Sequence, residues 1–191
     1  MSATIITKVQ GRRVWDSRGR PTVEAEITLA GGTSGRAIAP AGASRGSNEA
    51  IDLRDGNLAS SELGGLGVSR AVQAVRTEIA GTLRGLDATD QAAVDEALIA
   101  LDGTPTKARL GGNASIAVSM AVLHAAAQAE GLPLWRMLAG NNSVRLPLPE
   151  IQIFGGGAHA GRRIDIQDCM IIALGAHSFD EAVLMTAEVY A

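Results

Sequence analysis

The sequence is short of cysteine, of aromatic side chains and of long apolar runs, and each shortage excludes a class of protein. Cys169 is the one cysteine in 191 residues, which excludes an intrachain disulfide and favours a reducing compartment. Aromatic residues make up 3% of the chain, and the formal net charge is −3 without a basic run, so a nucleic-acid surface is not expected. No stretch approaches the roughly 18 apolar residues of a membrane span, and the amino terminus lacks a signal-peptide core. We therefore expect a cytoplasmic protein with no nucleic-acid or membrane partner.

Cysteine and histidine are also too sparse to pair at metal-ligand spacing, which argues against structural zinc. Lysine occurs twice, as Lys8 and Lys107, against 15 arginines, and no GxxxxGK[ST] loop is present. The chain is rich in aliphatic side chains, because hydrophobic residues make up 46% of it and aromatic residues only 3%. That composition supports a real core in one medium domain, or in one small domain and part of another.

Residues 4–39 predict three strands joined by short turns. The run at 9–15 ends at a cluster of turn-forming residues, 16–21, and residues 22–29 alternate apolar and polar. The pair Gly31-Gly32 then returns the chain into residues 35–39. Turn signals between alternating runs indicate an antiparallel meander.

Helices are predicted after a small-residue loop at 40–47. Apolar side chains at helical spacing form one face of the first helix: Val68, Val72, Val75 and Ile79. Asp90 is positioned to cap the second helix, whose face comprises Val94, Leu98 and Leu101. Asn113 is positioned to cap the third, with a stripe of Ile116, Met120, Leu123 and Ala127. Gly131 and Pro133 end that helix, and a last short helix is predicted at 134–138.

A domain boundary is expected after this short helix, giving a first domain of residues 1–138 and a second of residues 139–191. In the second, residues 146–154 and 164–174 are apolar runs of strand length. Ser178 with Glu181 three positions later predicts a capped helix. The sequence stops inside that helix, so we expect the second domain to be incomplete.

A glycine-rich turn at 155–161 lies between these two runs, and the carboxylate of Asp168 lies within the second run. Glycines let the backbone approach a ligand closely, and His159 can donate to an anion or move a proton. Asp168 is expected at the buried end of a strand, where a carboxylate is costly unless it has partners or a function. A hairpin turn with a capping histidine and an aspartate at a strand end explains the same spacing, and both readings remain open on spacing alone.

The loop at 40–47 also has two readings. Its Gly, Ala and Ser residues leave backbone amides free, which suits a cover over a phosphate or a metal ion. An ordinary helix-capping loop has the same composition. A nucleophilic role for Ser44 is not expected, because no base is near it in the sequence.

Several segments, in one register along nearly the whole chain, resemble the enolase family. They are DSRGRPTVE at 16–24, PAGASRG at 40–46, EA at 49–50, LRDG at 53–56, LDGT at 101–104, LGGNA at 110–114, GLPL at 131–134, GGAHA at 156–160 and QDCM at 167–170. The resemblance implies an α+β amino-terminal capping domain, with a three-stranded antiparallel meander plus helices, followed by the start of a β/α barrel. It also implies a magnesium-dependent lyase of glycolysis that interconverts 2-phosphoglycerate and phosphoenolpyruvate.

The resemblance assigns roles to individual positions. Ser44 matches the loop serine that reaches a second magnesium ion when the loop closes, and Gly42 and Ala43 share the substrate-binding loop with it. His159 matches the histidine near the phosphate and leaving group, and Gln167 matches a substrate-contacting glutamine. Asp168 falls where the family usually has one glutamate of a catalytic acid pair.

Some positions depart from the family pattern. Asp168 is one methylene shorter than the usual glutamate, and Gln152 and Gly155 each replace a usual asparagine. Ala41 and Arg45 replace a usual serine and threonine of the loop, and Arg162-Arg163 adds two positive charges near the turn. These departures favour either a divergent enzyme, similar to carboxyphosphonoenolpyruvate synthase and acting on a phosphonate or phosphorylated hydroxy acid, or neutral drift in a working enolase.

The family's acidic magnesium ligands, its base lysine and its second acid-pair glutamate lie on later barrel strands, which would follow residue 191. We therefore expect residues 1–191 alone to be inactive. The resemblance also implies a homodimer or a higher homo-oligomer. An alternative is an enolase-like fragment that acts only by association with a partner.

Overall fold

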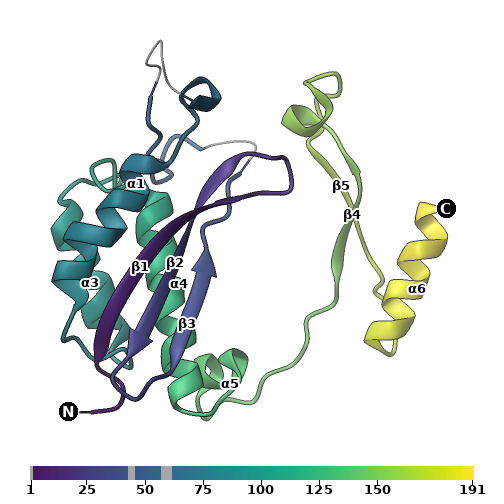
Figure 1. Ribbon diagram of the computed structural model, residues 1–191. Helices are drawn as coiled ribbons and strands as arrows, with labels where there is room; N and C mark the ends of the chain where they lie inside the picture. The colour runs from purple at the N-terminus through teal and green to yellow at the C-terminus, as the bar shows by residue number, and fades with distance from the viewer. Residues whose placement is uncertain (1, 43–45, 57–61) are drawn as a thin grey trace. The chain divides into compact units, whose positions relative to one another are not determined.

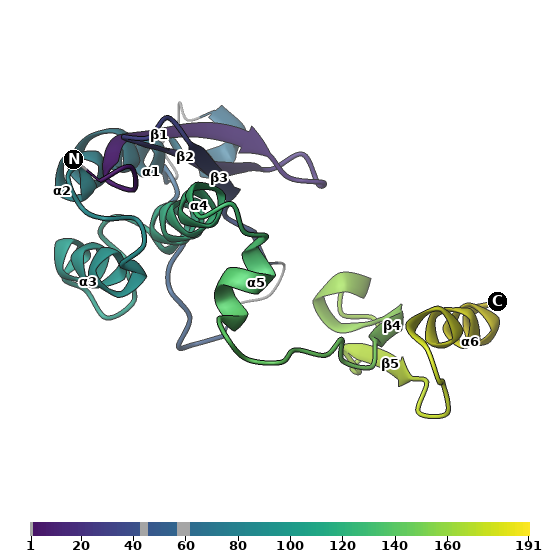
Figure 2. The ribbon, with the colours of Figure 1, turned by 90° about the horizontal axis from the view of Figure 1, so that it is seen from below.

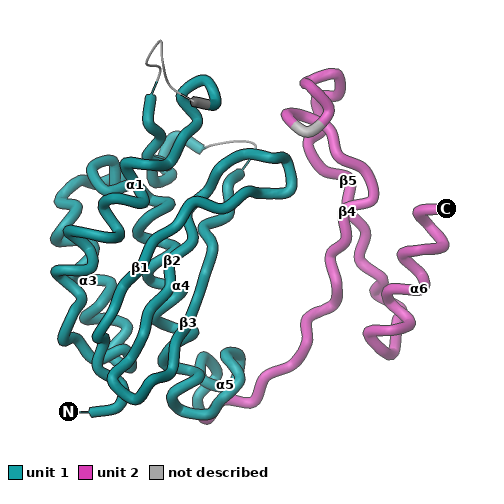
Figure 3. The backbone as a smooth tube through the Cα atoms, viewed as in Figure 1, with its two compact units in different colours: residues 1–140 teal, residues 141–191 magenta. Residues whose placement is uncertain are grey.

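The computed structural model describes residues 2–42, 46–56 and 62–191, without the side chains of Glu62 and His159. The chain forms two compact units, residues 1–140 and residues 141–191 (Figure 3). No helix of the described ranges is long and apolar enough to cross a membrane.

Unit 1 is built on a three-stranded antiparallel sheet, and the predicted meander is confirmed (Figure 1). Its strands are β1 (Ile6–Trp15), β2 (Pro21–Leu29) and β3 (Ser34–Ile38), in the order β1-β2-β3. The turn at 16–21 is held by Asp16, whose Oδ1 accepts from the backbone N–H groups of Arg18 and Arg20, each at 2.8 Å. Alternation along β2 buries Val23, Ala25, Ile27 and Leu29 in the core, as a strand with one face against helices requires.

A nearly continuous helical stretch packs against β1. It consists of α1 (Ser69–Ala74), the π-helical turn η2 (Val75–Ile79) and α2 (Ala80–Leu83), after a short 3-10 helix, η1 (Glu62–Gly65). Its predicted face is confirmed, because Val68, Val72, Val75 and Ile79 are all buried in the core. A Cβ on Gly11 would lie 2.9 Å from the Val75 Cβ, so a glycine in β1 permits this close packing.

Three further helices complete unit 1: α3 (Gln91–Asp102), α4 (Gly112–Ala129) and α5 (Leu134–Ala139). Helix α4 packs against β2 and β3, and α3 packs on α4 (Figure 2). The predicted cap of α3 is confirmed, since the Asp90 side chain accepts from the Ala93 N–H at 3.0 Å. The predicted cap of α4 is wrong. Gly111 occupies the cap position, and Asn113 lies inside the helix, where it bonds to Leu53.

The apolar stripe predicted for α4 is mostly wrong: Ala127 is buried and Leu123 is half-buried, but the two other members face solvent. Ile116 and Met120 are exposed, at 48% and 38%. The buried face consists of small residues: Ala114, Ala117, Val118, Ala121, Val122, Ala125 and Ala126. A Cβ on Gly35 of β3 would lie 2.3 Å from the Ala121 carbonyl oxygen and 2.1 Å from the Ala125 nitrogen. The sheet therefore approaches α4 so closely that only its small-residue face fits there.

Unit 2 is an antiparallel hairpin followed by a helix. Its elements are β4 (Glu150–Gly155), the 3-10 helix η3 (Gly157–Ala160), β5 (Asp168–Ile172) and α6 (Phe179–Tyr190). Both strands are shorter than the apolar runs that predicted them. The predicted cap of α6 is confirmed, with Ser178 Oγ accepting from the Glu181 N–H at 3.1 Å. The Glu181 carboxylate bonds back to the N–H of His177, one residue before the cap, at 2.7 Å.

Candidate functional site

The turn between β4 and β5 is closed by backbone hydrogen bonds and tight glycine contacts. The Gly156 N–H donates to the Gln167 carbonyl at 2.6 Å, and the Gly157 N–H donates to the Ile164 carbonyl at 2.8 Å. A Cβ on Gly156 would lie 1.9 Å from the carbonyl oxygen of Ile166. No other residue fits at Gly156 without displacing the backbone that leads into Gln167 and Asp168.

Asp168 stands at the first position of β5, opposite Gly155 of β4. Two amide groups converge on its carboxylate: Gln152 Nε2 donates to Oδ1, and Gln167 Nε2 donates to Oδ2 at 3.3 Å. The expectation that Asp168 is buried is wrong, because the side chain is exposed within this chain. The strand begins at this residue and pairs with a single neighbour, so nothing in unit 2 covers it.

Gln152 is a site residue whose contact with Asp168 the sequence did not predict. Between Gln152 and Phe154 the register of the hairpin shifts, so that Gln152 pairs with Met170 while Gly155 pairs with Asp168. Gln152 is therefore diagonal to Asp168, a separation that a long side chain can bridge. The alternation of apolar and polar residues predicts which side chains share a face of the hairpin. It does not predict a bulge, and the bulge changes which residues of the two strands lie opposite each other.

His159 lies within η3, between the two strands, and its side chain is outside the described atoms. The residues after it, Arg162 and Arg163, are exposed, and Arg162 adopts a left-handed φ of 61°. The hairpin end thus carries the Asp168 carboxylate, which two amide groups hold in place. It also carries two solvated guanidinium groups a few residues earlier in the sequence. This arrangement can bind an anion and exchange a proton through Asp168.

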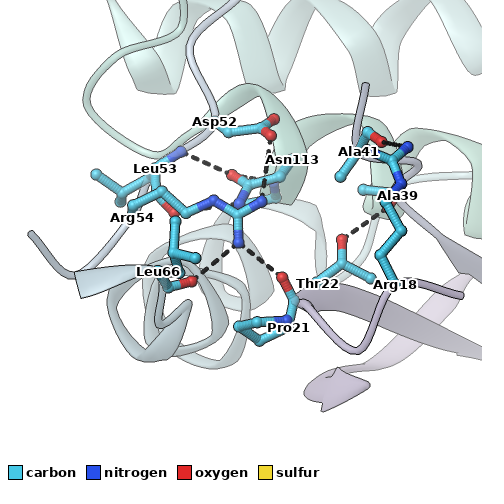
Figure 4. A network of polar contacts seen from close by, with 11 residues as sticks. Arg18, Pro21, Thr22, Ala39, Ala41, Asp52, Leu53, Arg54, Leu66 and Asn113 are labelled. Atoms are coloured by element: carbon cyan, nitrogen blue, oxygen red, sulfur yellow. Dashed lines mark hydrogen bonds and ion pairs between the residues drawn. The ribbon is translucent and has the colours of Figure 1, made fainter. Parts of the chain in front are cut away.

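The second predicted site segment, Gly42, Ala43 and Ser44, belongs to unit 1. Gly42 is described and exposed, whereas Ala43 and Ser44 lie outside the described residues. The chain leading into this segment is fixed to the sheet (Figure 4). Thr22 Oγ1 donates to the Ala39 carbonyl at 2.7 Å, and Arg18 Nη2 donates to the Ala41 carbonyl at 3.2 Å.

The chain leaving this segment is fixed to α4, to the start of β2 and to the turn before α1 (Figure 4). Asn113 pairs with both backbone groups of Leu53: its Oδ1 accepts from the N–H and its Nδ2 donates to the carbonyl, each at 3.1 Å. Arg54 Nη1 donates to the carbonyls of Pro21 and Leu66, at 2.6 and 3.0 Å. The fold of unit 1 therefore fixes both ends of the loop to rigid elements.

Asp55 completes this anchoring at the start of α1. Its carboxylate accepts from the N–H groups of Ser69 and Arg70, both at 2.9 Å. Burial raises the pKa of Asp55, but these hydrogen bonds stabilise the charged form and hold the pKa below its usual range. Asp55 thus acts as a remote cap for α1, whose own cap residue, Val68, has no side-chain hydrogen bond.

Magnesium prefers several oxygen ligands, of which carboxylates are the protein's main contribution. Among the described residues, no three His, Cys, Asp or Glu side chains come together in a group that could hold a metal ion. The described part of the chain therefore does not fit a magnesium site by itself, and we assign no magnesium ligand within it. The predicted contact of Ser44 with magnesium stays a prediction.

The fold by itself defines a class: a three-stranded meander domain with helices packed on its sheet, followed by a separate unit of one hairpin and one helix. Residues 6–138 match the enolase N-terminal domain, and residues 143–191 match the enolase C-terminal TIM barrel domain. The chain belongs to the enolase family, and at the level of the family it is part of an enolase-type lyase.

Proposed function

We propose that this chain contributes the capping domain and the opening barrel elements of an enzyme that interconverts 2-phosphoglycerate and phosphoenolpyruvate. The observation that carries this proposal is the ordered match of both domains of one lyase family, at 6–138 and 143–191. Magnesium, which this family uses, belongs to the proposal as its cofactor. When bound, such an ion stabilises the negative charge that develops on a carboxylate substrate.

The roles of this chain's own residues follow from the hairpin end. We assign to Asp168 the donation of a proton to the hydroxyl that leaves as water, and in the reverse direction the removal of that proton from the water that adds. We assign to Gln167 a contact with the substrate. The amides of Gln152 and Gln167 support this role, because they orient both oxygens of the Asp168 carboxylate. His159, in the turn between the strands, is assigned to the phosphate and the leaving group. Gly42, Ala43 and Ser44 are assigned to the loop that covers the substrate.

The test is formation of phosphoenolpyruvate from 2-phosphoglycerate, with magnesium present and after its removal by a chelator. The longest protein that the gene encodes and residues 1–191 are assayed side by side. We expect magnesium-dependent product from the former and none from residues 1–191. If the longest product forms no phosphoenolpyruvate at excess substrate, this substrate assignment is wrong.

A divergent substrate, a phosphonate or another phosphorylated hydroxy acid, is the second candidate. The favouring observation is that Asp168 is bonded by Gln152, so two departures from the family pattern are in mutual contact. The added positive charge of Arg162 and Arg163 suits a substrate with more negative charge than 2-phosphoglycerate.

Restoring the family residues separates the two candidates. For the divergent candidate, Asp168→Glu with Gln152→Asn and Arg45→Thr should raise activity on 2-phosphoglycerate. For an ordinary enolase, the present pair already works as a unit, and the same changes should leave activity unchanged or lower it.

We also propose that the protein acts as a homodimer or higher homo-oligomer in the cytoplasm. Membership of the enolase family supports this proposal. Light scattering coupled to size-exclusion chromatography tests this, and a monodisperse monomer at high concentration contradicts it.

A further inference from the structure

A pocket of about 350 Å³ lies between α3, the first half of α4 and residue Ala50, at the place where the two helices pack (Figure 2). Its walls include Leu98, Ile99 and Ile116. Ile99 and Ile116 are 52% and 48% exposed, so their apolar surface is not covered by the fold. Pockets that bind small molecules have this range of volume and this lining, mostly apolar with a few polar groups.

Lys107 is among the residues that line the pocket and provides a positive charge there. Its backbone has a left-handed φ of 55°, which is costly for a residue with a Cβ. Two hydrogen bonds keep it there: its N–H donates to the Thr104 carbonyl at 3.3 Å, and its carbonyl accepts from the Gly111 N–H at 3.0 Å. The ammonium group donates to the Thr104 carbonyl at 3.3 Å. In these contacts the ammonium group donates only to a neutral carbonyl, so the positive charge of Lys107 remains available to an anion.

The other charged group that lines the pocket is Asp95, and neutral side chains occupy one of its two carboxylate oxygens. Its Oδ1 accepts from Gln91 Nε2 at 3.0 Å and from Ser119 Oγ at 2.7 Å. Ser115 also lines the pocket, and its buried Oγ has no hydrogen-bond partner among the described atoms. An unpartnered buried hydroxyl costs free energy that a ligand's polar atom can recover.

We propose that this pocket binds a small molecule with a short apolar chain and a carboxylate. The chain lies between Ile99 and Ile116, and the carboxylate points toward Lys107. The pocket contains none of the residues assigned to the lyase reaction.

The test is a titration of residues 1–191 with sodium hexanoate, followed by amide chemical shifts in ¹H–¹⁵N NMR spectra. We expect saturable shifts at residues 95–119, with a dissociation constant on the order of 1 mM for so small a ligand. Hexanol and hexylamine, which have the same chain without the carboxylate, should bind at least about threefold more weakly, as expected for loss of one partly exposed ion pair. Shifts that do not saturate, or equal binding of hexylamine, overturn the proposal.

Matched variants locate the site. Lys107→Gln should weaken hexanoate about threefold and leave hexanol unchanged, whereas Lys8→Gln, at the only other lysine, should change neither. Ile116→Trp should block both ligands, and Leu138→Trp on exposed α5 should block neither. Amide dispersion of each variant reports that it is folded. Unaltered hexanoate binding by folded Lys107→Gln and Ile116→Trp variants contradicts the assignment.

Discussion

Residues 1–140 and residues 141–191 differ most in where their large apolar side chains lie. Every residue of the buried hydrophobic core cluster belongs to unit 1, from Ile6 to Ala126. In unit 2 the large apolar side chains are mostly exposed; Leu146 and Leu174 are 80% and 79% accessible. A lone two-stranded hairpin is marginally stable in water. Unit 1 therefore supplies its own stability, while unit 2 needs a surface that covers its apolar side chains to become equally stable.

The sharpest test of this comparison is a matched pair of leucine truncations. Leu83→Ala removes a fully buried side chain of α2, and we expect it to lower the free energy of unfolding by about 2–5 kcal/mol. Leu174→Ala, in unit 2, should change it by less than about 0.5 kcal/mol. Chemical denaturation of residues 1–191 measures both. Equal losses would show that the two units share one core.

A matched pair of asparagines tests the anchoring of the chain around Leu53. Asn113→Ala leaves the N–H and carbonyl of Leu53 without their side-chain partner, which should cost about 1–3 kcal/mol. Asn142→Ala, at an exposed position of unit 2, is the control and should be neutral. The urea midpoints of the two variants give the comparison, and an Asn113→Ala protein as stable as wild type would contradict the anchoring.

Removing the two helix caps separates local from global stability. Asp90→Ala removes the cap of α3 in unit 1 and should lower the unfolding free energy by about 1 kcal/mol. Ser178→Ala removes the equivalent cap of α6 in unit 2. It should reduce the helical circular dichroism signal without moving the main unfolding transition. A shift of that transition by Ser178→Ala would mean that α6 unfolds together with unit 1.

Acid should destabilise unit 1 through carboxylates such as Asp102. Burial raises the pKa of Asp102, but hydrogen bonds from Thr104 and Leu110 outweigh this and lower the pKa below its usual range. A lowered folded-state pKa adds stability above the unfolded value of about 3.9, and that stability is lost as the pH falls through the folded pKa. The urea midpoint should therefore fall as the pH is lowered from about 5 through the folded-state pKa of Asp102. Asp102→Asn should make the fall shallower, and an identical fall in this variant would remove Asp102 from the explanation.

Local sequence signals predicted the local structure of both units well. The alternation at 22–29, the turn at Asp16 and the caps at Asp90 and Ser178 depend on neighbours within a few residues, and all four are confirmed. The cap predicted at Asn113 failed because its amide is used by Leu53, sixty positions away in the sequence. A contact between residues so far apart in the sequence has no signature in the local spacing of apolar and polar residues.

The two larger errors have the same origin in contacts between distant segments. An alanine-rich helix such as α4 can bury either of two faces, and the close approach of Gly35 selected the face of small residues. For the site, resemblance identified the candidate at Asp168, but its exposure and its bond to Gln152 depend on the bulged register of the hairpin. Neither the register nor the bulge can be read from the apolar pattern.

Asp168, oriented by Gln152, is central to the proposed chemistry as the group that donates a proton to the hydroxyl that leaves as water. The most direct measurement is the rate of phosphoenolpyruvate formation by the longest gene product carrying Asp168→Asn, with Gln152→Ala beside it. We expect Asp168→Asn to lower kcat by about 10²-fold or more, and Gln152→Ala to lower it less and to shift the pH profile, both with an unchanged unfolding midpoint. An Asp168→Asn enzyme within about twofold of wild type would contradict this role.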